Sequence, residues 1–253
     1  DKDQGKYKIY PTYRKEISGN DIGVWFSYDT KPGETIYVQT GVSFVSEENA
    51  LLNLTTEQPK LDFAAVRRAA EDSWEKALRV VEVEGGTTDQ RKIFYTALYH
   101  LLIHPNILQD VNGQYPMMGS LQTATTKHDR YTVYSLWDTY RNVHPLLSIL
   151  YPRKQLAMVE TMLDMYKEGG WLPKWELYGQ ETFTMEGDPS IIVINDTWQR
   201  GIRDFDTKLA YEAMLKGATT PGKDNKLRPD FDDYASRGYV PLREKFDNSV
   251  SHA

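Results

Sequence analysis

Residues 169–187, GGWLPKWELYGQETFTMEG, lie between two strongly helical segments and cannot continue either helix. Pro173 and four glycines exclude a continuous helix, and two tryptophans, one tyrosine and one phenylalanine are interleaved with three glutamates. A long aromatic loop between helices is typical of a segment that lines a binding pocket. An ordinary loop whose tryptophans fill a gap in the core fits the composition equally well.

Aromatic side chains with interleaved carboxylates suit a sugar, because rings stack on its C–H faces and carboxylates bind its hydroxyl groups. Glycoside cleavage needs one protonated carboxyl that donates to the leaving oxygen and a second carboxylate as base or nucleophile. An inverting enzyme holds the two about 6.5–9.5 Å apart. Glu176, Glu181 and Glu186 are the candidates in this loop, and their spacing does not choose among them.

The rest of the chain from residue 62 onward reads as successive helices. Asp62 is the expected N-cap of an amphipathic helix that runs into residue 83, and Thr88 is expected to open the next helix. That next segment, residues 89–105, is apolar on most faces, which predicts an inner helix. Helical patterns follow in residues 135–151, 153–170, 190–202 and 205–218. Pro145 predicts a kink or a new helix inside the first of these. Consecutive helices in antiparallel pairs suggest part of a helical toroid.

Residues 1–46 instead read as short β-strands with turn residues between them. The strand-like runs are YKIYPTYRK (7–15), VWFSYDT (24–30) and TIYVQTGVSFVS (35–46). Three strands make a poor sheet by themselves, so we expect a portion of a larger sandwich whose other strands lie before Asp1.

The composition excludes several classes of function. The net charge of −6 argues against nucleic acid, and the absence of cysteine excludes thiol catalysis and thiolate metal sites. No segment has the roughly 18 apolar residues that span a membrane, and no signal-peptide pattern is present at Asp1. His100 and His104 have the spacing of a metal pair on one helix, but on an apolar helix we favour core histidines. Phosphate-binding loops and the nucleophile elbow of serine hydrolases are absent from the sequence.

Asp138 and Arg141 are three residues apart beside Trp137. The simpler interpretation is an ion pair on one helix turn, which contributes little. The alternative is that Trp137 and Asp138 face a pocket, where Asp138 accepts two sugar hydroxyls.

Three segments together resemble one family. VEVEGGTTDQRKIFYTALYHLLIHPN (81–106), YSLWDTYRNVHPLLSILYP (134–152) and WLPKWELYGQETFTMEGDPSIIVINDTWQRGIRDFD (171–206) are similar to the calcium-dependent, inverting exo-α-mannosidases. The resemblance extends over the chain from about Val42 onward, in consistent order. It implies the strands of an N-terminal β-sandwich in residues 1–46, a helical linker in 47–86 and the first part of an (α/α)6 toroid in 87–253. Both domains are expected to be incomplete.

The resemblance also implies the site. The family's general acid is the glutamate of an Asn-Glu-Thr triplet, which reads Gln180-Glu181-Thr182 here, so Glu181 inherits that role. The Trp-Asp-Thr motif maps onto Trp137 and Asp138 as sugar-binding residues. The side chains expected around the sugar are Trp137, Asp138, Arg141, Trp171, Lys174, Trp175 and Gln180. Ca²⁺ is the implied cofactor, and its ligands are not placed.

The implied substrates are mannose-containing oligosaccharides or glycoproteins, and the implied location is the periplasm or the cell exterior. In the family a segment like SVSHA (249–253) leads into a helix that carries the water-activating aspartates, so the general base is expected beyond Ala253 and the chain resembles a central fragment. Two alternatives stay open: a toroid glycosidase acting on glucosides or trehalose, and a non-catalytic sugar-binding or scaffold protein.

Overall fold

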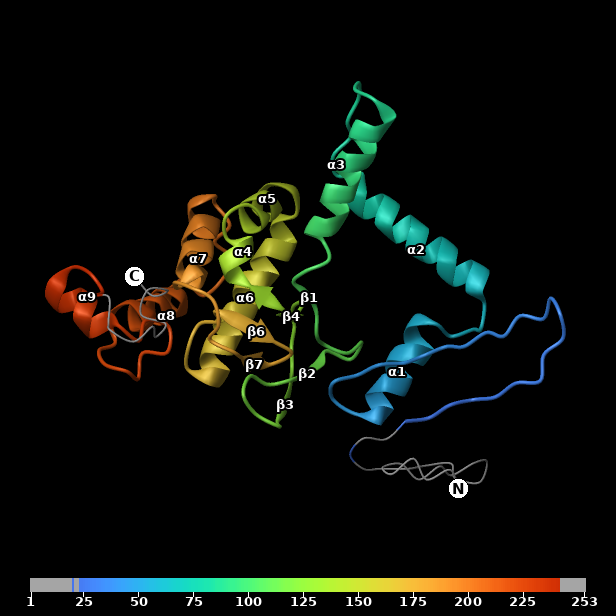
Figure 1. Cartoon of the computed structure of the whole chain (residues 1–253), viewed down its shortest axis with the longest axis horizontal. Helices are drawn as coiled ribbons and strands as arrows, with labels where there is room; N and C mark the ends of the chain where they lie inside the picture. Colours follow the sequence, from blue (N-terminus) through green and yellow to red (C-terminus); the bar gives the residue numbers. More distant parts are fainter. Residues whose placement is uncertain (1–19, 21–22, 242–253) are drawn as a thin grey trace. The chain divides into compact units, whose positions relative to one another are not determined.

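The computed structural model describes residue 20 and residues 23–241. The chain divides into two compact units, Asp1–Tyr37 and Val38–Ala253, and the helices and strands of the described residues all lie in the second (Figure 1). The helices are α1 (Glu47–Glu57), α2 (Phe63–Leu78), α3 (Thr88–Leu101), α4 (Leu136–Thr139), α5 (Val143–Leu150), α6 (Pro152–Gly169), α7 (Pro189–Gln199), α8 (Thr207–Thr219) and α9 (Phe231–Arg237). The strands are β1 (Asn106–Ile107), β2 (Gln114–Pro116), β3 (Thr123–Thr125), β4 (Tyr131–Thr132), β5 (Tyr134–Ser135), β6 (Trp175–Leu177) and β7 (Gln180–Glu181).

The segment before α1 differs from the expectation. Residues 23–46 contain no helix or strand, although two of the predicted strands lie there, and the third predicted strand falls outside the described residues. An extended segment becomes a strand only when a neighbour takes its N–H and C=O groups. The tight turn is present, with the Glu34 amide donating to the Lys31 carbonyl at 3.0 Å. The helix-rich character of the second unit is confirmed, its small sheets were not predicted, and the sandwich and the toroid stay predictions.

The first residues of the helices are explained by N-capping side chains and by proline. Asp62 caps α2 as predicted, because its carboxylate accepts from the Ala65 amide at 2.9 Å. Helix α3 begins at Thr88 as predicted; the preceding Thr87 is its N-cap, and Gln90 completes a capping box with it. Pro145 sits in the first turn of α5, where a missing N–H costs no helical hydrogen bond, so a new helix begins there instead of a kink.

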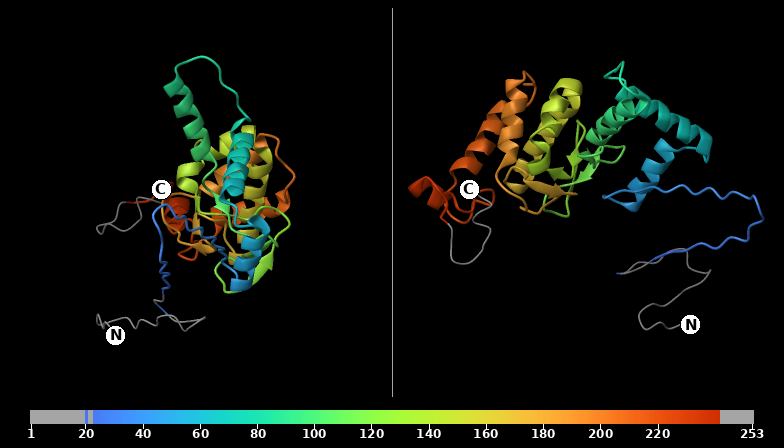
Figure 2. Two further views of the ribbon diagram at one scale, coloured as in Figure 1. Left: turned by 90° about the vertical axis from the view of Figure 1, so that its right-hand side faces the viewer. Right: turned by 45° about the horizontal axis from the view of Figure 1, so that its top comes forward.

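The hydrophobic core surrounds α6. This helix packs against α5, α7 and α8, and α5 also packs against α7 (Figures 1 and 2). Fully buried side chains come from each of these helices and from the loop after α6: Leu147, Val159, Met162, Met165, Leu172, Val193, Ile194, Ala210 and Ala213. Gly170 ends α6 in the left-handed conformation, which redirects the chain into residues 171–187.

The prediction that α3 is an inner helix is wrong for this structure. Only Leu98 of α3 is buried, and Ile93 is 69% exposed. The helix packs on α2, where the Trp74 and Tyr99 rings lie 4.5 Å apart. His100 and His104 are exposed, so they are not core histidines.

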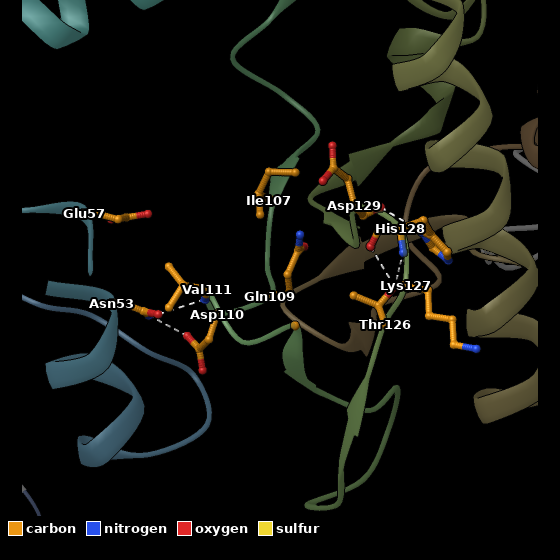
Figure 3. A pocket seen from close by; sticks show the side chains of 11 residues that line it. Asn53, Glu57, Ile107, Gln109, Asp110, Val111, Thr126, Lys127, His128 and Asp129 are labelled. Atoms are coloured by element: carbon orange, nitrogen blue, oxygen red, sulfur yellow. Dashed lines mark hydrogen bonds between the residues drawn. The ribbon is translucent and has the colours of Figure 1, made fainter. Parts of the chain in front are cut away.

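Residues 106–133 contain two short antiparallel pairs, β1 with β4 and β2 with β3. Asp110 joins this region to α1, because its carboxylate accepts from Asn49, Asn53 and Ser43 at 2.7 Å each. Figure 3 shows Asn53 directed at Asp110 on one side of a polar cavity of about 380 Å³. His128 lines the opposite side of this cavity.

A buried ion pair joins residues 106–133 to the end of α6. Arg130 is fully buried and donates to Glu168 at 2.9 Å and 3.3 Å. Glu168 also accepts from the Tyr115 hydroxyl at 2.7 Å and the Met118 amide at 2.8 Å. These donors satisfy the buried carboxylate, which fixes the end of α6 to the strands.

The third sheet, β5–β6–β7, is antiparallel and holds the loop that follows α6. Its centre is the Glu176 carboxylate, which is 0% exposed. Glu176 accepts from the Thr132 hydroxyl at 2.9 Å, the Val133 amide at 3.1 Å and the Gly179 amide at 2.6 Å. Burial raises the pKa of Glu176, and these donors together with the charge of Arg130 oppose that rise. Glu176 thus connects β4, the β5 entry and the β6–β7 turn.

We expect Glu176→Gln to destabilise the protein by about 2–3 kcal/mol, because the amide N–H₂ would face donors and leave buried groups unsatisfied. Thermal unfolding of the purified variant measures the loss. Glu186→Gln, an exposed glutamate of the same loop, is the matched control and should change stability by less than about 0.5 kcal/mol. Equal melting temperatures for the two variants would contradict the role of Glu176.

His128 makes the stability depend on pH. Its Nε2 lies 2.9 Å from Asp164 Oδ2 and its Nδ1 lies 3.0 Å from the Asp129 carbonyl, so two acceptors face the ring and only the imidazolium satisfies both. Burial lowers the pKa of His128, but the Asp164 carboxylate and the Asp129 carbonyl outweigh burial, and the net pKa is raised.

A raised folded-state pKa means that this stabilisation is complete below the unfolded value of about 6.5 and is lost as the pH rises through the folded value. We expect His128→Gln to cost about 1 kcal/mol at pH 5.5 and clearly less at pH 8.5. Unfolding curves of both proteins at the two pH values test this. A difference that does not depend on pH would refute the charged state of His128.

Candidate active site

The β5–β6–β7 sheet brings two distant segments together. Ser135 pairs with Trp175, and the chain runs from Ser135 directly into α4, which carries Trp137 and Asp138. On the other side of β6, Glu176 pairs with Glu181 of β7. The sheet, called the platform below, therefore places β5, which leads into α4, and β7, which carries the predicted acid, on either side of β6.

The Glu181 carboxylate is held by backbone amides. Its Oε1 accepts from the Trp175 amide at 2.9 Å and the Phe183 amide at 2.7 Å, and its Oε2 accepts from the Lys174 amide at 2.7 Å. Each carboxylate oxygen has about two acceptor positions. Oε1 is therefore filled, whereas Oε2 has one N–H partner among the described residues and room for a proton. The orientation of Glu181 is fixed, and Oε2 keeps one acceptor position that no described residue fills.

The backbone around Glu181 is strained. Positive φ angles occur at the non-glycine residues Val133 (64°), Tyr178 (48°), Phe183 (51°) and Met185 (63°). Three of these lie in residues 169–187, and Val133 precedes β5. Such conformations cost about 1–3 kcal/mol each and persist where the surrounding structure fixes them, commonly at functional sites. The strain supports the loop as a site and disfavours an ordinary connection.

The residues of α4 occupy the exposed edge of the platform. Asp138 is exposed and accepts a hydrogen bond from the Ser135 hydroxyl. The Arg141 guanidinium lies 5.0 Å from the Trp137 ring and 4.8 Å from the Tyr140 ring. The expected Asp138–Arg141 ion pair is therefore replaced by a contact to Ser135 and a cation–π stack. Asp138 keeps acceptor capacity toward solvent.

The other predicted site residues are divided between surface and interior. Gln180 is exposed and Trp175 is half-buried. Trp171 packs against the core, with the Lys216 amine 4.7 Å above its ring. The Lys174 side chain is only 1% exposed, so its amine faces the interior and a direct sugar contact is not the role that this geometry favours.

The three glutamates of the loop have separate environments. Glu176 is buried in the sheet, Glu186 is exposed, and Glu181 is half-buried at the edge. Only Glu181 combines a fixed orientation with access to solvent. Sequence reasoning missed Thr132 and Val133, which hold Glu176, because neither residue type carries a signal for that role.

The structure assigns no calcium ligands among the described residues. Calcium takes six to eight oxygen ligands, and no group of three or more His, Asp or Glu side chains suited to a metal occurs in the described part of the chain. We therefore derive no catalytic step through calcium. In residues 23–241 no helix is long and apolar enough to cross a membrane.

Comparison with known proteins identifies the family of the chain. Residues 49–253 match the model of the glycosyl hydrolase family 92 catalytic domain. An uncharacterized secreted glycosidase of Arthroderma benhamiae is 29% identical over 83% of the chain, which corresponds to 24% of that protein. The fold resembles a family GH92 inverting mannosidase of Bacteroides thetaiotaomicron, with a TM-score of 0.74 and 31% identity over 80% of the chain and 28% of the other protein.

A second structure from that organism, an alpha-mannosidase in complex with mannoimidazole, gives a TM-score of 0.72 and 32% identity over 79% of the chain and 26% of its own length. The chain thus spans about a quarter of the length of these relatives. The family model covers most of the chain, and the solved structures share its fold. The chain belongs to glycosyl hydrolase family 92.

Proposed function

We propose that the protein is a glycoside hydrolase that releases terminal α-linked mannose from oligosaccharides or glycoproteins with inversion, and that Glu181 is its general acid. The observation that carries the assignment is the place of Glu181 at the solvent-accessible edge of the platform, where three backbone amides fix the orientation of its carboxylate. Membership of family 92 and the likeness to solved mannosidases of that family support the substrate class.

In this reaction Glu181 Oε2 gives its proton to the glycosidic oxygen as the bond from that oxygen to the anomeric carbon breaks. Water attacks the anomeric carbon from the opposite face, and a second carboxylate removes a proton from that water. The product sugar then has inverted configuration, and Glu181 is left ionised. We assign the base to no described residue.

The exposed edge of the platform is the proposed sugar-binding surface. Asp138 accepts hydroxyl protons, and Gln180 offers an amide beside the acid. The half-buried Trp137 and Trp175 rings provide apolar faces, and Arg141 stacks on Trp137. Trp171 contributes from the core side of the same loop. These roles are proposals that rest on the motif resemblance and on exposure.

Three further features belong to the same proposal. The helices belong to an (α/α)6 toroid, and residues 1–46 pair with further strands of a β-sandwich in the longer protein, as the resemblance implies; in this structure residues 23–46 form no strand. Activity depends on calcium, with ligands that we do not assign. The secreted relative supports export of the protein to the periplasm or the cell exterior.

The test of the acid is Glu181→Gln in the full-length protein, assayed on an α-linked mannobiose and on an aryl α-mannoside with a good leaving group. We expect the rate on mannobiose to fall by about 10²–10⁴-fold, and the rate on the aryl mannoside to fall much less because its leaving group needs no proton. Glu186→Gln is the control with the same charge change. A near-normal mannobiose rate in Glu181→Gln would refute the assignment.

The substrate class is tested by a panel of aryl glycosides and trehalose, each with and without a calcium chelator. Cleavage of mannosides alone, abolished by the chelator and restored by calcium, is the expected result. Cleavage of glucosides or trehalose would favour a different toroid glycosidase, and mannose binding without turnover would favour a non-catalytic protein.

A further inference from the structure

We propose that the glycan beyond the terminal mannose binds in a groove that begins at the aromatic pair Phe44 and Tyr178 and continues along α1. This inference rests on the proposed function, since it takes the terminal mannose to lie beside Glu181. It narrows the substrate class to oligosaccharides longer than a disaccharide.

Tyr178 belongs to the tight turn that joins β6 to β7. Leu177 pairs with Gln180, so Tyr178 and Gly179 are the two turn residues, and their φ angles are positive, 48° and 82°. A two-residue hairpin turn with two positive φ angles favours Asn-Gly, and a bulky residue is an unfavourable choice there. The backbone conformation alone therefore does not explain a tyrosine at this position. Its side chain is 44% exposed, so burial does not explain it either.

The turn is held from two sides, which fixes where the Tyr178 ring starts. The Tyr178 amide donates to the Thr132 hydroxyl at 2.8 Å, and the Gly119 amide donates to the Gly179 carbonyl at 2.7 Å. Tyr178 and Glu181 are three residues apart, so their Cα atoms lie within about 11 Å of each other. A saccharide of a few units, with its terminal unit beside Glu181, covers that distance.

Phe44, in the segment before α1, stacks on Tyr178. The ring centroids lie 4.9 Å apart, and the ring planes differ by 20°. Phe44 is 53% exposed, so the pair leaves aromatic surface open to solvent. Open aromatic faces suit the apolar C–H faces of sugars. The pair connects the loop that carries the acid to the segment before α1.

Phe44 also lines a cavity of about 390 Å³ beside α1 and the residues that follow β1. This cavity adjoins the one of about 380 Å³ in Figure 3, because several residues line both. Each is as large as typical small-molecule sites, which have about 300–1,000 Å³. We call the two cavities together the α1 groove. The residues that line both are Asn53, Glu57, Ile107, Gln109 and Asp110.

The α1 groove offers a hydrogen-bond acceptor and a hydrogen-bond donor to a ligand. The Glu57 carboxylate is exposed, and no hydrogen bond or ion pair joins it to another described residue. Gln109 Oε1 accepts from the Arg130 amide at 2.8 Å, which leaves the N–H₂ group of Gln109 without a partner in residues 23–241. Asp110 and Asn53 are bonded to each other and form the wall. Sugar hydroxyls donate and accept, so they match a carboxylate beside an amide.

The experiment compares kcat/KM of the full-length protein on mannobiose and on linear α-linked mannotetraose. We expect Tyr178→Asn to lower the value for mannotetraose by about 5–10-fold, mainly through KM, because the ring binds the ground state and the transition state alike. The value for mannobiose should change by less than about 2-fold. Asparagine suits the turn, so this variant removes the ring and keeps the backbone.

Three further variants make the test specific. Tyr178→Phe keeps the ring and should keep the wild-type value for mannotetraose. Glu57→Ala should lower that value by about 3–10-fold, whereas Glu47→Ala, at an exposed glutamate of the same helix, is the matched control and should not. Equal losses on mannobiose and mannotetraose in Tyr178→Asn would show that Tyr178 only supports the position of Glu181, and would overturn the proposal.

A binding measurement separates this proposal from the proposed function. Calorimetry with a thio-linked mannotetraose, which resists hydrolysis, gives the affinity without turnover. Weaker binding in Tyr178→Asn and in Glu57→Ala would support the α1 groove even if no mannoside is cleaved. Unchanged binding in both variants of an active enzyme would refute the groove and leave the mannosidase assignment standing. Absence of both binding and cleavage would refute both.

Discussion

The burial of one carboxylate, Glu176, is the constraint on which the site depends. A charged group in an interior is tolerated only with donors around it, and Glu176 takes them from Thr132, Val133 and Gly179. Those donors come from both sides of the sheet, so the carboxylate ties β4 and β5 to the β6–β7 turn. Because β6 is fixed, its neighbour β7 presents Glu181 to a backbone cradle at the exposed edge.

In the unit from Val38 onward, apolar helices form the core, and charged side chains are also buried near the strands. The helices α5 to α8 supply the core and make few specific demands on individual residues. The buried charged side chains include the Arg130–Glu168 ion pair and the side chains of Lys174, Glu176 and Asp188, which belong to the segment that follows α6. Burying them is costly, and so are the four positive φ angles nearby. That concentration of unfavourable features marks the region as functional.

The sequence predicted the helices well, because their apolar periodicity and capping residues are local signals, as at Asp62 and Gly170. The prediction for α3 was wrong. Its apolar sequence indicated a buried helix, but burial depends on which other elements pack against it, and most of α3 is exposed. The strands at residues 106–132 are two or three residues long, too short for a pattern. Glu181 was chosen by motif resemblance, whereas the separate environments of Glu176, Glu181 and Glu186 arise from contacts between distant residues that spacing does not encode.

The most direct measurement is a crystal structure of the full-length protein with mannoimidazole, the ligand bound by one of the related mannosidases. The account predicts the ligand on the exposed edge beside Asp138, with Glu181 Oε2 about 2.6–3.2 Å from the atom that takes the place of the glycosidic oxygen. It also predicts that Glu176 stays buried and apart from the ligand. A ligand bound on another face, or approached by a carboxylate other than Glu181, would contradict the account.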